Sequence, residues 1–355
     1  MLRPAREQAA QPSSARPGSA RLRIAAFALA AALTTTACLR LDTPPPEHPE
    51  LTAAESARQG AAIDAAVIAE AAARIGPGQE EHVAAALAAI AADAHAQVEA
   101  LGGIWIAWPE GAPEGVATPA PSPTADPAIT DPAGVLALLD ASWGAARAAA
   151  TSADATEAES LTLAAVTVSR AAQATRLADA IGVPAPNHTD PANPLVPDAL
   201  PGVEDSDLVI AYDSARYGLE TAAARLPEPY AGWAAARAGQ VRAALEAALA
   251  RGAEDRRQPA YPSGSATTHP DALEMARAAE ESLLGLVQSS LESAEPDQRA
   301  ALIDAATTSA TLLARLGGTL PALPGIVEPP EPSKNPSSSN SPNSPTATPT
   351  RSPTG

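Results

Sequence analysis

Residues 206–226 read SDLVIAYDSARYGLETAAARL. The larger apolar residues and two alanines in this stretch recur every three or four positions, at Leu208, Tyr212, Ala215, Leu219, Ala222 and Leu226. That spacing places them on one face of an α-helix. A helix with such a stripe is typical of a helical bundle, so the stretch predicts a helix that packs against others.

The composition extends this interpretation to most of the 355-residue chain. Alanine is abundant and aromatic residues make up only 3%. Alanine has the highest helix propensity, whereas the alternation of β-branched residues that marks strands is nearly absent. Residues 104–108, IWIAW, are the one short exception. The sequence therefore predicts an all-α fold.

Eight helical segments are marked by their own start and stop signals. Thr52 and Glu55 have the spacing of a capping box, and Asp131 followed by Pro132 supplies an N-cap and a proline at the first helical position. Glycines follow several of the segments. The predicted helices cover about residues 51–75, 79–101, 132–152, 156–181, 206–226, 229–251, 269–291 and 296–316.

The helices fall into two groups of four. A proline-rich stretch without periodicity, residues 183–204, is the predicted linker between an N-terminal helical region, residues 51–182, and a second one, residues 205–326. The pattern leaves open whether the two regions form one bundle or two. Residues 327–355 are almost entirely polar or proline, so they predict a disordered tail.

The N-terminus has the layout of an export signal. Five arginines and one acid precede an apolar run of ten residues, 24–33, which is too short to span a bilayer. Residues 33–38, LTTTAC, resemble the lipobox of bacterial lipoproteins, although Thr35 stands where an aliphatic residue is preferred. We expect residues 1–37 to be a lipoprotein signal peptide, Cys38 to be lipidated and residues 38–50 to be a linker. The alternative is cleavage at Ala37, which leaves a free thiol.

The charge balance limits the classes of molecule that the chain can bind. The chain carries 23 basic and 41 acidic residues, a formal charge of −18, and removal of residues 1–37 would change this to −22. Such a chain is repelled by nucleic acid and by anionic lipid. We therefore expect an extracytoplasmic protein that is held at the cell membrane by acyl chains on Cys38 and that does not bind nucleic acid.

Five short motifs stand out in the C-terminal region, at residues 211–226, 261–262, 279–281, 316–318 and 321–325. Together they resemble an actinobacterial family of ferritin-like domains of unknown function, often found as lipoproteins. The resemblance covers about residues 205–325, and residues 94–105 resemble a part that often precedes the domain. It implies a ferritin-like four-helix domain at residues 205–326.

A ferritin-like fold raises the question of a di-iron site. Such a site takes a Glu-x-x-His motif from each of two helices, because residues i and i+3 point at the same metal. No histidine of this chain lies in that motif: Gln79, Ala92, Ala185 and Ala266 stand three residues before His82, His95, His188 and His269, and His48 lies outside the predicted helices. We therefore expect no metal and no other cofactor.

Four acids of the C-terminal region allow two interpretations. In the first, Asp213 and Glu220 form an ion-pair row with Arg216, and Glu280 either pairs with an arginine or reaches water. In the second, Asp213, Glu220, Glu280 and Asp304 form a carboxylate-only metal site or a polar pocket, with Tyr217 nearby.

Trp105 and Trp108 lie in a predicted loop and also allow two interpretations. They could line a ligand groove, because aromatic residues are scarce in this chain, or they could cover the end of an alanine-rich bundle.

Three functions are compatible with these patterns. The first is a membrane-anchored, metal-free helical bundle with a structural or binding role in the cell envelope. The second is a metal-dependent enzyme, an oxidase or peroxide-handling protein, with carboxylate ligands only. The third is a small-molecule-binding lipoprotein that uses the tryptophan loop. An envelope protein or a small molecule is the expected partner.

Overall fold

The computed structural model describes residues 50–108, 110–113, 116, 123–188, 206–261 and 267–326. The chain divides into two units. One comprises residues 1–49 and 107–119, and its described part is a short non-helical segment. The other comprises residues 50–106 and 120–355 and contains every described helix. We call this second part the helical unit.

The prediction of an all-α fold with eight helices is confirmed for the described residues, which contain no strand. Residues 104–106, part of the one strand-like stretch, are irregular. The helices are α2 (Ala53–Ile75), α3 (Glu81–Ala100), α4 (Pro132–Ala150), α5 (Glu157–Ile181), α6 (Ser206–Ala223), α7 (Tyr230–Ala250), α8 (His269–Leu291) and α9 (Pro296–Arg315).

The sequence signals fix several helix ends. The Thr52 side chain accepts a hydrogen bond from the backbone N–H of Glu55, and the Glu55 carboxylate accepts one from the backbone N–H of Thr52, which completes the predicted capping box. Asp131 caps α4 in the predicted way. Gly182 ends α5 at φ 69°, a left-handed conformation that glycine adopts without strain. Helix α6 ends three residues earlier than predicted, in a turn.

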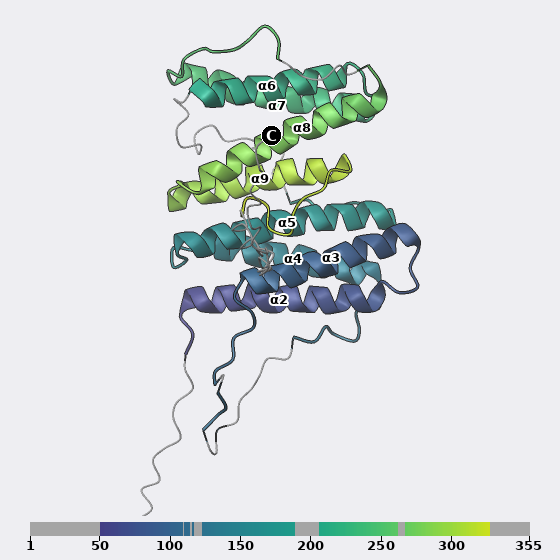
Figure 1. Ribbon diagram of the computed structural model, residues 1–355, viewed down its shortest axis with the longest axis vertical. Helices are drawn as coiled ribbons and strands as arrows, with labels where there is room; N and C mark the ends of the chain where they lie inside the picture. Colours follow the sequence, from purple (N-terminus) through teal and green to yellow (C-terminus); the bar gives the residue numbers. More distant parts are fainter. Residues whose placement is uncertain are drawn as a thin grey trace, which may run out of the picture. The chain divides into compact units, whose positions relative to one another are not determined.

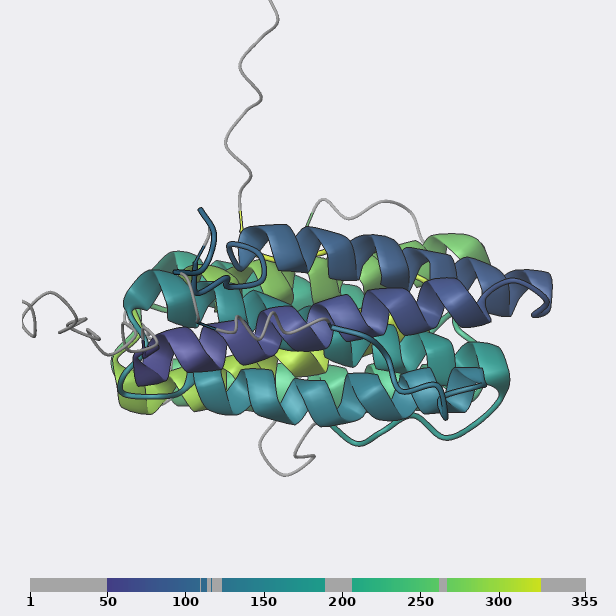
Figure 2. The same cartoon turned by 90° about the horizontal axis from the view of Figure 1, so that it is seen from below.

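The N-terminal helices form a closed group of four. Helix α2 packs against α3 and α4, and α5 packs against α3 and α4, so each helix has two main neighbours in the group. The helix axes run in roughly the same direction (Figure 2). This is the arrangement expected when two helical hairpins bury their apolar faces against each other.

The C-terminal helices pack directly against this group of four. Helix α6 packs against α7 and α8, α8 packs against α9, and α9 also packs against α5 (Figure 1). The two predicted regions therefore share one unit, joined through α5 and α9. Both helices are buried on almost every side in their central turns. Their many alanine, serine and threonine residues allow neighbouring helices to approach closely.

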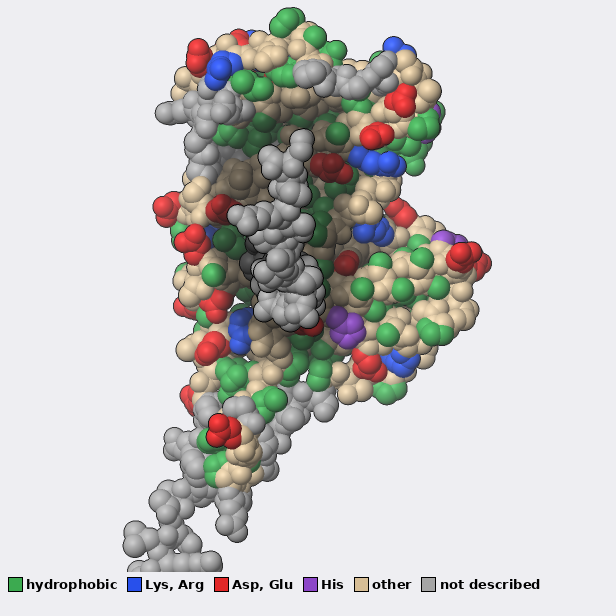
Figure 3. All heavy atoms as spheres, in the orientation of Figure 1, with side chains coloured by type: hydrophobic (Ala, Val, Ile, Leu, Met, Phe, Trp, Pro, Cys, Tyr) green, Lys and Arg blue, Asp and Glu red, His purple; other side chains and the backbone are tan. Residues whose placement is uncertain are grey.

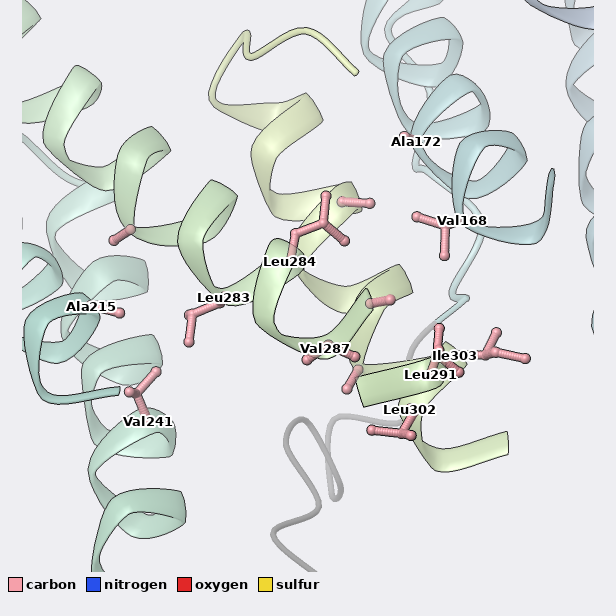
Figure 4. Packing of buried hydrophobic residues seen from close by; sticks show 14 of the residues in the cluster. Val168, Ala172, Ala215, Val241, Leu283, Leu284, Val287, Leu291, Leu302 and Ile303 are labelled. Carbon is pink, nitrogen blue, oxygen red and sulfur yellow. The ribbon is translucent and has the colours of Figure 1, made fainter. Parts of the chain in front are cut away.

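The apolar core has two parts. One cluster fills the α2–α5 group at one end, where Ile68, Leu87, Leu139 and Leu177 meet. The other cluster runs from the opposite end of that group through the whole C-terminal region. Figure 4 shows part of this second cluster, to which α5 contributes Val168 and Ala172, and α9 contributes Ile303.

Some sequence predictions lie outside the described residues. They are the signal peptide at residues 1–37, Cys38, nearly all of the 38–50 linker and the 327–355 tail, since the description ends at Ile326. Of the predicted 183–204 linker, residues 183–188 are described and are not helical. Among the described helices, none combines the length and the apolar character that crossing a bilayer requires.

Candidate functional site

An ion pair lies fully buried between helices of the C-terminal region. The Arg237 guanidinium of α7 donates to both carboxylate oxygens of Glu280 on α8, from Nε at 2.9 Å and from Nη2 at 3.2 Å. The side chains are 1% and 0% exposed. Glu280 lies on the core face of α8 because it stands four residues after Ala276 and four before Leu284, both buried. A two-point contact of this kind holds both groups in a fixed orientation.

Polar groups on other helices complete the surroundings of Arg237. Its Nη2 also donates to the Ser309 hydroxyl of α9 at 3.0 Å, and its Nη1 donates to the Gln240 side chain at 3.2 Å. One guanidinium thus connects α7, α8 and α9. Tyr212 of α6 is also buried in this core, where its hydroxyl has no hydrogen-bond partner among the described residues and burial raises its pKa.

A second network runs along α6. Arg216 lies between Asp213, at 2.7 Å, and Glu220, at 2.5 Å, and Glu220 also accepts a hydrogen bond from Arg242 of α7. The Asp213 side chain is fully buried, and its second oxygen accepts a hydrogen bond from the Tyr261 hydroxyl at 2.7 Å. Asp213 of α6 therefore binds the segment that connects α7 to α8, through Tyr261.

The acidic and basic groups in this network stabilise one another in their charged forms. Burial opposes the charge on Arg216, but its hydrogen bonds to Asp213 and Glu220 outweigh that effect and raise its pKa. Burial likewise acts to raise the pKa of Glu220, but the hydrogen bonds from Arg242 and Arg216 prevail and lower it. Both effects favour the charged forms, as expected for an ion-pair row.

The fourth acid lies on a different helix and has a different partner. Asp304 of α9 accepts two hydrogen bonds from Arg147 of α4, each at 2.6 Å, and both side chains are 30% exposed. Hydrogen bonding to Asp304 raises the pKa of Arg147. This pair is a further link between the two helical regions.

The structure thus does not gather the four acids into one site. Asp213 and Glu220 share Arg216, whereas Glu280 and Asp304 each hold an arginine of their own. Glu280 follows the first of its two alternatives, because it pairs with an arginine and does not reach water. In the part of the chain that the structure describes, no three histidine, cysteine or acidic side chains lie close enough to hold a metal ion.

A second buried arginine was missed by sequence reasoning. The Arg170 side chain of α5 is 0% exposed and donates to two backbone carbonyl oxygens, that of Ala61 on α2 at 2.8 Å and that of Ser142 on α4 at 3.1 Å. The carboxylate of Asp64 lies 4.0 Å away and is partly exposed. Burial lowers the pKa of Arg170 to about 10, against the opposing effect of Asp64.

Arg170 belongs to a polar layer across the α2–α5 group. In this layer the Gln97 amide of α3 donates to the Ser169 hydroxyl at 3.1 Å, and the Gln173 amide donates to Asp93 at 3.0 Å. The layer lies between the two apolar clusters. The signal in the sequence is the lack of a polar face on α5: a charged residue in a helix that is buried all round must itself be buried.

The two tryptophans are placed in different units. Trp105, in the helical unit, is partly buried, and its backbone N–H donates to the side-chain oxygen of Gln59 at 2.8 Å. Trp108 belongs to the other unit and is also partly buried. Neither side chain is fully exposed, and the three cavities described for the helical unit are lined by other residues.

Comparison of the chain with protein-family models, with curated proteins and with solved structures gives no match.

Proposed function

We propose that this chain is a lipid-anchored protein of the cell envelope, whose ferritin-like helical unit has a structural or binding role that needs no metal. The proposal joins two independent arguments. The order of basic residues, apolar run, small residue and Cys38 supports the anchor. The pairing of the acids with arginines supports the role of the helical unit.

The pairing of the four acids is the observation that carries the second argument. In a carboxylate-ligated metal centre, the oxygens must be free to face one ion. Here the Glu280 oxygens face Arg237, and the Asp304 oxygens face Arg147. A metal at either acid would have to displace a guanidinium, and in the first case would leave that cation buried without a partner. The arrangement therefore favours a structural role for these acids.

The surface charge argues against a nucleic-acid partner. Acidic and basic side chains are scattered over the face shown in Figure 3, and no basic patch gathers among the described residues on it. Combined with the formal charge of −18 for the whole chain, this makes electrostatic attraction to nucleic acid weak.

The anchoring is tested by cell fractionation. Replacement of Cys38 by Ala removes the acylation site, so the protein should move from the membrane fraction to the soluble fraction or the medium. The matched control is Thr34→Ser, which keeps both the cysteine and the small residue before it. Retention of the Cys38→Ala variant in washed membranes would refute the lipid anchor.

A further inference from the structure

A polar cavity of about 240 Å³ lies in the helical unit beside the end of α5. It is lined from α5, from α9 and from the segment that follows α5. The residues used below are Thr175, His188, Thr308, Thr311 and Arg315. None of them belongs to the ion-pair networks described above, so the cavity is a separate feature of the structure.

His188 is the buried polar group of this cavity. Its side chain is 1% exposed, and its Nε2 lies 2.9 Å from the Asp140 carboxylate of α4. Its ring also packs against Trp143, with the ring centroids 4.6 Å apart. The contact with Asp140 favours the tautomer in which Nε2 carries the proton and donates it to the carboxylate.

That tautomer leaves the other ring nitrogen as an acceptor. Burial lowers the pKa of His188, although the hydrogen bond to Asp140 acts in the opposite direction, so the neutral ring is favoured. Its Nδ1 is buried and has no hydrogen-bond partner among the described residues. A buried acceptor without a donor has lost its hydrogen bond to water and gained none in return, which is unfavourable. A ligand N–H or O–H that reached Nδ1 from the cavity would supply the missing donor.

The threonines of the cavity add further acceptors. The hydroxyls of Thr175, Thr308 and Thr311 each donate to a carbonyl of their own helix, at 2.9 Å in all three cases. A hydroxyl that has donated its proton keeps lone pairs for accepting hydrogen bonds. The cavity therefore offers several acceptors to a ligand that carries hydroxyl or ammonium groups.

Arg315 adds a positively charged hydrogen-bond donor. It stands at the end of α9 and is exposed. Its guanidinium can hold a carboxylate at the cavity. Asp140 keeps its negative charge, but it does not line the cavity and its side chain is 54% exposed, so water screens that charge.

We propose that this cavity binds a small carboxylic acid that also carries a hydroxyl or ammonium group. The carboxylate pairs with Arg315, and the hydroxyl or ammonium group donates to His188 Nδ1 and to the threonine hydroxyls. This binding site goes beyond the proposed function and does not depend on the anchor at Cys38, so the two can fail separately.

The test is isothermal titration calorimetry on the intact chain with three matched probes. L-lactate carries both groups, propionate lacks the hydroxyl, and 1,2-propanediol lacks the carboxylate. For so small a ligand we expect lactate to bind with a Kd on the order of 1 mM. Propionate and propanediol should each bind at least about tenfold more weakly, a difference of about 1.4 kcal/mol.

Substitutions of the lining residues test whether lactate binds in this cavity. Arg315→Gln should weaken lactate binding about tenfold, whereas Arg299→Gln, on the first turns of the same helix, should leave it unchanged. His188→Leu should remove the preference for lactate over propionate, with circular dichroism as the check on folding. The proposal is wrong if lactate gives no saturable heat, if propionate binds equally well, or if Arg315→Gln behaves like Arg299→Gln. Preferential binding of inorganic phosphate would overturn the ligand class.

Discussion

The N-terminal and C-terminal helices each bury one arginine completely, and they surround it differently. Arg237 meets a fully buried carboxylate, Glu280, in a two-point contact. Arg170 meets two helix carbonyls, and its nearest carboxylate, Asp64, lies 4.0 Å away and is partly exposed. The first arginine depends on one partner of opposite charge, whereas the second relies on the dipoles of the backbone.

This difference predicts how much stability is lost when one side chain is removed from each arrangement. An ion pair in a core must keep both members, because either one alone is a bare charge in an apolar environment. A guanidinium that donates to helix carbonyls leaves nothing charged and buried behind when it is removed, since those carbonyls also accept within their own helices. The C-terminal core should therefore be the more sensitive of the two to a single substitution.

The largest effect is expected at Glu280. Glu280→Ala leaves Arg237 buried without a carboxylate, so the free energy of unfolding should fall by about 3–5 kcal/mol. Urea unfolding followed by circular dichroism measures this. In the matched control, Arg237→Met combined with Glu280→Leu, both charges are absent and most of the stability should return. If the double variant is as unstable as Glu280→Ala, the charge of Arg237 is not the cause.

The next largest effect is expected where the two regions meet. Ala172 of α5 is 2% exposed and belongs to the cluster that continues into α9. Ala172→Leu adds volume to a packed interface, which should cost about 1–3 kcal/mol. The control is Ala243→Leu on the exposed face of α7, where a change within about 0.5 kcal/mol is expected. Equal effects of the two substitutions would show that the α5–α9 interface is loosely packed.

The smallest effect is expected at Arg170. Arg170→Met removes the hydrogen bonds to the Ala61 and Ser142 carbonyls, but it also removes a charge that burial disfavours. The two effects partly cancel, so the free energy of unfolding should fall by only about 1 kcal/mol. The same urea experiment measures it. A loss as large as that of Glu280→Ala would show that Asp64 compensates Arg170 more strongly than its distance suggests, and would end the contrast between the two regions.

Sequence reasoning reached the secondary structure because its signals are local. The capping box at Thr52 and Glu55 and the apolar stripe of α6 depend on residues three or four positions apart, and both were confirmed. The partners of the acids depend on helices distant in the chain. Arg147 and Asp304 stand 157 positions apart, and no spacing rule brings them together.

Arg170 and His188 show a different limit. An arginine in an alanine-rich helix normally faces water, so the burial of Arg170 follows from the sequence only once the missing polar face of α5 is recognised. His188 lies in the stretch that the sequence assigns to a linker, and it does not fit the Glu-x-x-His motif, so no local pattern predicts its burial. Its contacts with Asp140 and Trp143 come from tertiary packing. The ferritin-like resemblance and the lipid anchor stay predictions.

The position of α9 between α8 and α5 also sets an order of events during synthesis. Helices α2–α5 are complete before α9 leaves the ribosome, so the face of α5 that α9 covers has no partner until the last described helix arrives. Folding cannot finish before that point, and a chain truncated before Pro296 would expose a strip of closely packed, small-residue surface. Such a fragment would be prone to self-association.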